Sequence, residues 1–306
     1  MPSTDRRSGS DDLFAPLRAA VLRGLQGTFG DGPPDLSEYE SPPGDPGLFG
    51  PGSLPWRVHA DLPSMLVGGY CALMLQSLHP LAMAGVTEHS RFEENYRARL
   101  GRTARFIGGT TFGSTAFAER LIEEVRSIHN HVHGTAPDGR PYSANDPELL
   151  SWVHTAEVWS FLRAYQRHSL DPLVGSERDG YLRQVAEVAY RLGAAEVPRS
   201  VGEVRSYLAA VRPALAATPE ALRAAAFLHH PPGIGTAREL VLHHVVYEAS
   251  VELLPGWARR MLRLRRLPGS AVSAPLAASG LGALIRWAIG GSLVAGVSAE
   301  RAAAAG

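Results

Sequence analysis

The chain has 306 residues, of which 45% are hydrophobic, enough for one large helical domain or two smaller ones. Its 30 basic residues balance 30 acidic ones, so no net field favours nucleic acid or an anionic membrane. Every basic residue is an arginine, which excludes lysine Schiff-base chemistry and a P-loop lysine. The single Cys71 excludes an internal disulfide and a cysteine-rich metal site.

Residues 1–55 are expected to form a flexible amino-terminal segment followed by an arm rich in glycine and proline, with a short helix at 13–25. Tyr39, Phe49 and Trp56 are candidates for packing this arm onto the rest of the protein. The first residues, MPSTDRRSGSDD, have no apolar run behind their arginines, so no secretory signal peptide is indicated. We therefore expect a cytoplasmic location.

Residues 56–265 show the patterns of a single multi-helix, all-α domain, without a convincing strand. The expected helices are 62–78, 92–106, 115–132, 147–165, 180–192, 200–211, 219–228 and 237–254. The first of these is apolar nearly all round, which indicates a buried helix. Asp146, Pro147 and Glu148 predict a strong start for the helix at 147, because they offer a cap, an N1 proline and an acid in the first turn. Between residues 79 and 89 we expect a helix end, a loop and a new helix start.

Residues 266–306 are expected to form a C-terminal helix and a tail. The apolar stretch 277–296 is interrupted by Arg286 and by several glycines. These residues favour a buried or interfacial helix over a membrane span. Membrane contact is therefore expected only through this stretch.

A run of histidines begins near the end of the helix predicted at 115–132. His129 shares a helix face with Ile122 and Val125, whereas His131 points roughly the opposite way. An inward imidazole among aliphatic side chains suits a haem axial ligand, because the iron needs a neutral ring nitrogen in an apolar pocket. A core histidine bonded to a carbonyl is the alternative, and spacing alone favours it. His133 also has a simpler role, as a last-turn residue interacting with the helix dipole.

His154, on the helix predicted at 147–165, is a second candidate ligand because it shares a face with apolar residues. A hydrogen bond that joins two helices is an equally good interpretation. His129 and His154 are also candidates for two ligands of a non-haem metal, but acidic partners at helical spacing are not obvious. We interpret Glu157 as a solvated surface charge.

Arg99, Arg102 and Thr103 stand at i, i+3 and i+4, so they share one side of a helix. Such a side can bind an anion or polarise a peroxide. Haem propionates are carboxylates that arginine binds well, and threonine can donate a hydrogen bond to bound dioxygen. A solvated stripe on the surface is the alternative. The histidine pairs at 229–230 and 243–244 lack complementary ligand spacing. His243 or His244, on an apolar helix, is placed to approach the site, although a core role is favoured for them.

Four segments resemble one known family: ALMLQSLHPLAMAGVTEHSRF, RLGRTARFIGGTTFG, IHNHVHGTAPDGRPYSANDPELLSWVH and VELLPGWARRML. The resemblance is to the DUF2236 family, which includes the fungal oxygenase of mycophenolate biosynthesis and the bacterial rubber oxygenases, and it covers about residues 56–265. It implies an all-helical fold with a globin-related core and a b-type haem held by a proximal histidine. It also implies oxidative cleavage of a carbon–carbon double bond in an isoprenoid chain.

Residue by residue, the resemblance implies that Arg99 and Thr103 match the motif arginine and threonine, and that His129 matches the axial histidine. Arg102 stands where rubber oxygenases carry a lysine that can occupy the distal iron position. A guanidinium offers no lone pair to iron, so the sixth position is expected to be open or water-filled. Since no signal peptide is indicated, a small lipophilic or polyketide-like substrate is expected in place of rubber.

The sequence thus predicts a haem b-dependent oxygenase whose partners are dioxygen and a lipophilic small molecule. Its candidate catalytic residues are Arg99, Arg102 and Thr103, and its candidate cofactor residues are His129, Arg99 and His154, with His129 on the iron. Two alternatives remain open. One is a haem-free helical protein of the same fold that binds a small molecule or a partner, and the other is a non-haem iron oxygenase.

Overall fold

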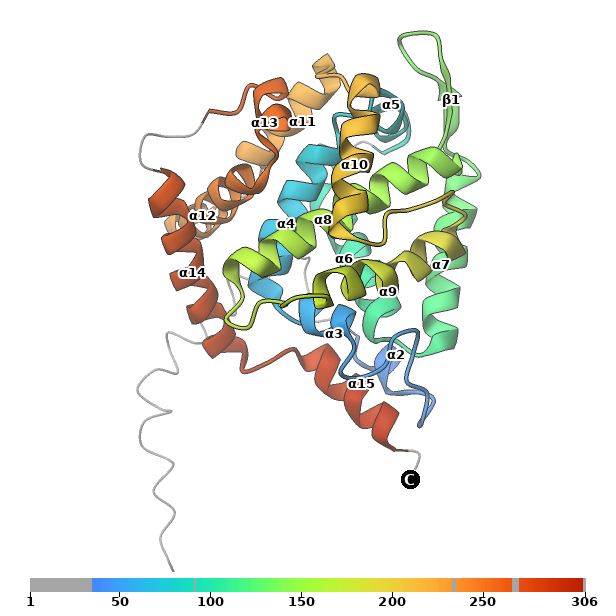
Figure 1. Cartoon of the computed structure of the whole chain (residues 1–306), viewed down its shortest axis with the longest axis vertical. Coiled ribbons are helices and arrows are strands. Elements are labelled where there is room, and N and C mark those ends of the chain that lie inside the picture. The colour runs from blue at the N-terminus through green and yellow to red at the C-terminus, as the bar shows by residue number, and fades with distance from the viewer. Residues whose placement is uncertain (1–34, 91, 233–234, 266–269, 305–306) are drawn as a thin grey trace, which may run out of the picture.

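The computed structural model describes residues 35–90, 92–232, 235–265 and 270–304 (Figure 1). Almost all regular structure in these residues is helical, which confirms the prediction of a single all-α domain. The helices are α2 (Ser37–Glu40), α3 (Leu54–His59), α4 (Leu62–Gln76), α5 (Pro80–His89), α6 (Tyr96–Phe112), α7 (Thr115–His129), α8 (Pro147–His168), α9 (Glu177–Leu192), α10 (Val201–Val211), α11 (Pro219–His229), α12 (Ala237–Leu253), α13 (Gly256–Met261), α14 (Ser270–Ile289) and α15 (Leu293–Ala303). The helix predicted at 13–25 lies outside the described residues.

Helices α4 and α8 form the most extensive helix contact and the centre of the fold (Figure 1). Gly68 permits their close approach, because a Cβ there would lie 2.9 Å from Cδ1 of Phe161, closer than real Cβ contacts. On another side of α4, the hydroxyl of Ser250 in α12 donates to the carbonyl oxygen of Val67 at 2.8 Å. The predicted burial of this apolar helix is therefore found.

Most predicted helices agree with the observed ones to within a few residues. The predicted start of α8 is confirmed, because Oδ1 of Asp146 accepts hydrogen bonds from the backbone N–H groups of Glu148 (2.9 Å) and Leu149 (3.0 Å). Helix α6 begins later than predicted, at Tyr96, and continues past several glycines to the buried Phe112. Tertiary packing thus outweighs the low helix propensity of glycine there.

Two local predictions are wrong. A small antiparallel hairpin exists, in which β1 (His133–Thr135) pairs with β2 (Pro141–Ser143). The segment after His79 is helix α5 and not a loop, because Pro80 occupies the first helical turn, where the missing N–H group has no partner to lose.

The glycine- and proline-rich arm packs through its aromatic residues, as predicted. Tyr39 and Trp56 are buried, and the partly buried Phe49 joins them in a hydrophobic cluster with Phe112 and Phe117. Helix α15 adds apolar side chains to this cluster and packs beside α2 (Figure 1). The arm and the last helix therefore cover the same end of the α6–α7 pair.

A buried arginine joins α15 to the arm. Arg301 is 3% exposed, and its guanidinium donates to the carbonyl oxygens of Tyr39, Asp45 and Phe112, each at 2.9 Å. Burial lowers the pKa of Arg301, and the negative charge of Asp45 opposes this shift. The cation is buried without loss of its hydrogen bonds, which is the condition for placing it there.

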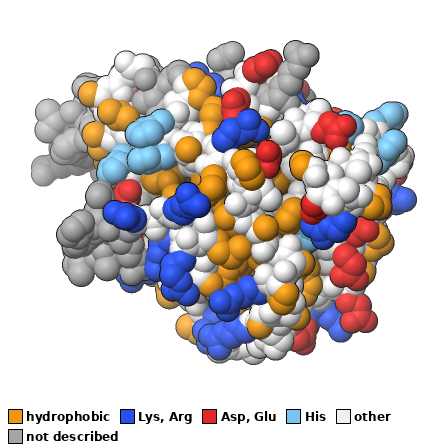
Figure 2. Space-filling model, turned by 90° about the horizontal axis from the view of Figure 1, so that it is seen from above, with side chains coloured by type: hydrophobic (Ala, Val, Ile, Leu, Met, Phe, Trp, Pro, Cys, Tyr) orange, Lys and Arg blue, Asp and Glu red, His pale blue; other side chains and the backbone are white. Residues whose placement is uncertain are grey.

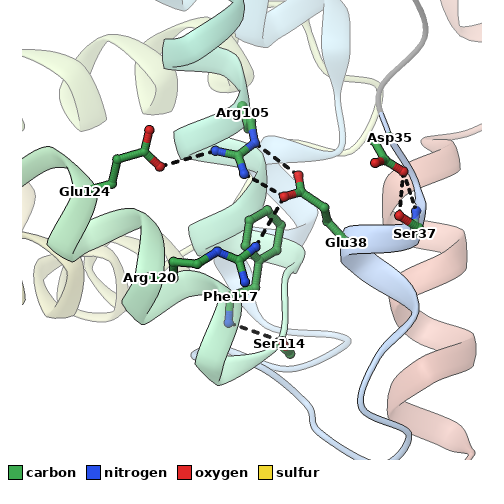
Figure 3. A network of polar contacts seen from close by, with 8 residues as sticks. All are labelled: Asp35, Ser37, Glu38, Arg105, Ser114, Phe117, Arg120 and Glu124. Carbon is green, nitrogen blue, oxygen red and sulfur yellow. Dashed lines mark hydrogen bonds and ion pairs between the residues drawn. The ribbon is translucent and has the colours of Figure 1, made fainter.

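Glu38 of α2 fixes the arm by charge. Figure 3 shows Arg105 of α6 and Arg120 of α7 directed at its carboxylate. Arg105 donates through Nη2 at 2.6 Å and Nε at 3.0 Å, and Arg120 donates at 3.2 Å. The two guanidinium carbons also lie 5.3 Å and 4.8 Å from the centroid of the Phe117 ring.

The apolar stretch 277–296 is divided between two helices. Helices α14 and α15 meet at a bend of 51°, where Gly290 and Gly291 have φ values of 69° and 122°. Arg286 of α14 forms a bidentate pair with Asp61 at 2.6 Å and 2.8 Å. Among the described helices, none is by itself long and apolar enough to cross a membrane. The bent pairs α4 with α5 and α14 with α15 reach that length and composition together.

Candidate functional site

His129 is the last residue of α7 and is partly buried. Its Nδ1 atom is buried and has no hydrogen-bond partner in the described part of the chain. Burial lowers the pKa of His129, so the ring is neutral at pH 7. His131 is exposed, with its Nδ1 2.9 Å from the carbonyl oxygen of Ser127, and His133 is exposed in β1. The structure thus agrees with an inward orientation for His129 and an outward one for His131.

Arg99, Arg102 and Thr103 all lie on α6, as their spacing predicts. Arg99 is partly buried, and its Nη1 donates to the hydroxyl of Ser90 at 2.6 Å. Burial, followed by repulsion from Arg102, lowers the pKa of Arg99. Arg102 and Thr103 are exposed. Arg99 therefore points inward, whereas the side chains of Arg102 and Thr103 are in contact with solvent.

His154 and Glu157 lie one turn apart on α8 and are both partly buried. Nε2 of His154 is buried and has no hydrogen-bond partner among the described residues. Burial lowers the pKa of His154 to about 4 and raises the pKa of Glu157 to about 7. The interpretation of Glu157 as a solvated charge is wrong, because the residue is partly buried on α8 and its carboxyl group is desolvated.

His59, the last residue of α3, was not among the candidate residues. Its ring nitrogens lie 2.7 Å from the hydroxyl of Thr111 and 2.9 Å from that of Tyr181. Burial, and then the neighbouring His154, lowers the pKa of His59 to about 3. Burial, and then Glu157, raises the pKa of Tyr181. His59 at the end of α3 and Tyr181 on α9 are therefore close enough to His154 and Glu157 on α8 for their charges to interact.

One face of α4 contains every partly accessible residue of that helix: Leu62, Met65, Gly69, Leu73 and Gln76. The amide of Gln76 donates to the carbonyl oxygen of Val153 on α8 at 2.9 Å, which brings the face beside the part of α8 that contains His154 and Glu157. We call these α4 residues, together with Val153, His154 and Glu157, the α4–α8 face.

Gly69 marks a place on the α4–α8 face where no other side chain packs against α4. A Cβ added to Gly69 would meet no heavy atom within 4 Å, so the space beside this helix is open. His154 and Glu157 are partly accessible, yet desolvation is the cause of both of their pKa shifts. A face with aliphatic side chains and one neutral imidazole nitrogen can hold an apolar group and offer it a single ligand atom.

The structure also brings together histidines that are distant in sequence. His229 ends α11, and His244 lies on α12 one turn before Glu248, and ligand atoms of these three residues all lie within 4.8 Å of one another. The prediction that these histidines lack complementary ligand spacing is therefore wrong. The missed signal was the i, i+4 spacing of His244 and Glu248; the position of His229 depends on how α11 packs against α12.

Comparison with known families gives one match. The family model described as "ER-bound oxygenase mpaB/B'/Rubber oxygenase, catalytic domain" matches residues 56–287. This range begins at the end of the arm and includes α4, α6, α7, α8 and most of α14. No curated protein and no solved structure gives a match. Since the matched range is most of the chain, the protein belongs to the family of the mpaB and rubber oxygenase catalytic domains, which places it among the oxygenases.

Proposed function

We propose that this chain is a haem b-dependent oxygenase that uses dioxygen to cleave a carbon–carbon double bond in a lipophilic small molecule of the isoprenoid or polyketide class. The observation that carries the proposal is His129, a neutral imidazole with a buried and unpartnered ring nitrogen in an oxygenase of this family. A buried nitrogen without a partner costs free energy, and binding to a metal would remove that cost.

The donor chemistry of the described residues fits a haem. Haem iron takes a neutral imidazole nitrogen, and the porphyrin needs apolar surroundings. His129 on α7 and His154 on α8 each meet the first requirement. Of the two, His154 belongs to the α4–α8 face, whose aliphatic side chains and open space beside Gly69 meet the second. A bound haem would supply the oxidative chemistry, while the protein binds and orients the substrate and excludes water.

The arginines of α6 supply positive charge for carboxylates. Arg99 contributes a guanidinium, a group that stays protonated in proteins. In this proposal Arg99 and Arg102 would bind propionates or another anionic group, and the hydroxyl of Thr103 would be available to donate a hydrogen bond to dioxygen or to a water molecule. Arg102 has no lone pair, so it cannot act as a metal ligand in the way that a lysine does.

The proposed substrate class depends on the walls of the α4–α8 face. Leu62, Met65 and Leu73 give this side of α4 an apolar surface that packs on the main hydrophobic core. An apolar substrate gains free energy there by leaving water, at roughly 25 cal/mol per Å² of buried surface. A strongly charged substrate would lose its hydration without gaining a partner.

The test is the absorption spectrum of the purified full chain, produced with ample haem supply. We expect a Soret band that His129→Ala abolishes and His131→Ala preserves, since only the first removes an inward ring. Loss of the band in His154→Ala with retention in His129→Ala would move the axial ligand to α8. A colourless protein that stays colourless after haem reconstitution would overturn the proposal.

The two alternatives have separate outcomes in the same experiment. Stoichiometric iron without a Soret band, lost in His129→Ala or His154→Ala, indicates a non-haem iron oxygenase. Absence of both iron and haem, combined with binding of a lipophilic probe, indicates a haem-free binding protein. The cytoplasmic location stays a prediction.

A further inference from the structure

A group of histidines lies on the surface, outside the α4–α8 face. Figure 2 shows histidine side chains gathered at the left of the surface seen from above, the side on which α11 and α12 lie in Figure 1. His229 is partly buried at the end of α11, His244 is exposed on α12, and Glu248 is partly buried one turn further along α12. One ligand atom from each lies within 4.8 Å of the other two.

The helices hold these three residues in place through neighbours. The Nε2 atom of His243 lies 3.1 Å from the carbonyl oxygen of His229, which ties the end of α11 to α12. The ring of His229 stacks on Tyr247, with centroids 4.6 Å apart, and lies 3.9 Å from the ring of His230. His244 and Glu248 are four residues apart on a regular helix, so their side chains extend from the same face.

The start of α12 is also fixed. Thr236 and Glu239 form a capping box, in which the threonine hydroxyl accepts from the backbone of Glu239 at 3.2 Å and the glutamate accepts from the backbone of Thr236 at 3.1 Å. This acid is therefore committed to the helix end. Among the described residues, no hydrogen bond or ion pair engages the ring nitrogens of His229 and His244 or the carboxylate of Glu248.

We propose that His229, His244 and Glu248 bind a divalent transition-metal ion of the Zn²⁺ class. Two imidazoles and one carboxylate are a ligand set that such ions prefer, with a fourth position left for water. Tetrahedral bonds of about 2.1 Å need ligand atoms about 3.4 Å apart, which small side-chain rotations reach from the present separation. No cysteine is required, in agreement with a chain whose single cysteine is buried elsewhere.

The ion joins α11 to α12 and lies near a chain of hydroxyl groups. Nδ1 of His243 is 3.4 Å from the hydroxyl of Tyr70 on α4, and Tyr96 donates to that same hydroxyl at 2.7 Å. Tyr96 is the first residue of α6, the helix that contains Arg99. The metal site therefore stabilises the contact of α11 and α12 at a place connected to the start of α6.

The test is metal binding by the tag-free full chain after treatment with EDTA. Calorimetric titration with ZnSO₄ is expected to show one site of micromolar or tighter affinity, and Co²⁺ is expected to give the visible absorption of a low-symmetry site. His244→Gln and Glu248→Gln should each weaken Zn²⁺ binding about tenfold or more. Zn²⁺ should raise the melting temperature of the wild type and not that of either variant.

His131→Gln is the matched control, because it removes an exposed imidazole from a different part of the molecule. Its affinity for Zn²⁺ should equal that of the wild type. Circular dichroism of the metal-free variants checks that they fold, and both altered α12 residues are accessible enough for this to be expected. Wild-type binding weaker than about 100 μM, or unchanged affinity in both α12 variants, would overturn the proposal. The readout does not involve haem, so it is independent of the proposed oxygenase function.

Discussion

Two histidine–glutamate pairs on different helices show how surroundings decide chemistry. His154 and Glu157 on α8 are three residues apart, and His244 and Glu248 on α12 are four apart. On α8, burial lowers the pKa of the histidine to about 4 and raises that of the glutamate to about 7. On α12 the histidine is exposed, and a third ligand arrives from α11.

The two groups differ in what shifts the pKa values of their side chains. On α8, desolvation favours the neutral form of both residues, so near pH 7 His154 is uncharged and about half of the Glu157 carboxyls are protonated, without an ion pair between them. At the contact of α11 and α12, burial is the largest cause of the lowered pKa of His229, and the positive charges of the nearby His230, His244 and His243 lower it further. The inner pair is therefore governed by exclusion of water, and the outer group also by mutual repulsion among imidazoles.

The largest expected effect concerns His59, which lies close enough to His154 for their charges to interact. We call His59, His154 and Glu157 the inner group. The folded pKa of His59, about 3, lies below the ordinary value of 6.5, so its contribution to stability is complete above pH 6.5 and is lost as pH falls toward 3. Between pH 7.5 and pH 3.5 this loss amounts to about 4 kcal/mol. In His59→Gln the same fall in pH should cost about 4 kcal/mol less, measured by urea unfolding.

His131→Gln, an exposed histidine, is the comparison for this measurement. At pH 7.5 the His59 variant should itself be less stable by about 1–3 kcal/mol, because the hydroxyls of Thr111 and Tyr181 lose a partner. Equal acid slopes in the two variants would show that burial does not control the titration of His59.

The second effect distinguishes the two glutamates. The folded pKa of Glu157, about 7, lies above the ordinary value of 4.5. Burial of this carboxyl group therefore does not lower the free energy of unfolding below pH 4.5, and lowers it increasingly as pH rises from 4.5 to 7. Glu157→Gln should therefore raise the unfolding free energy by about 3 kcal/mol at pH 8 and leave it nearly unchanged at pH 4. Urea titrations at the two pH values measure this difference. Glu248→Gln, in EDTA, should change the free energy of unfolding by less than about 0.5 kcal/mol. If Glu248→Gln stabilised the protein at pH 8 as much as Glu157→Gln, the two glutamates would not differ in desolvation.

Strong local signals made parts of the fold predictable. Asp146 caps α8 and Pro147 is its first residue, so two adjacent residues define where this helix starts. The apolar composition of α4 indicates that the helix is buried. The loop expected after His79 is instead helix α5, because a proline in the first turn, here Pro80, begins a helix as well as it follows one. Strands β1 and β2 have three residues each, too few for an alternating pattern, and their pairing depends on the turn between them.

The site was less predictable, because its contacts join distant segments. Helical spacing alone separates the inward His129 from the outward His131. No local pattern around His59 indicates that Thr111 and Tyr181, 52 and 122 residues away, hold its ring. The prediction that Glu157 is solvated fails for a related reason, because its burial depends on neighbouring helices and not on its own sequence.

The smallest expected effect tests whether the inner group borders open space. Gly68 and Gly69 are adjacent on α4, but a Cβ on the first would lie 2.9 Å from Phe161, whereas one on the second would meet nothing within 4 Å. Gly68→Ala should destabilise by about 1–3 kcal/mol, since α4 and α8 must separate. Gly69→Ala should stabilise by up to about 1 kcal/mol, because alanine is the better helix former.

The same position also tests the use of that space. Gly69→Leu should fold with wild-type stability, measured by thermal unfolding, yet bind haem or a lipophilic probe more weakly because its side chain fills the α4–α8 face. Gly69→Ala, which adds one methyl group, should retain most of the binding. If Gly69→Ala destabilises the protein as much as Gly68→Ala, both sides of α4 are closely packed, and the α4–α8 face has no room for a ligand.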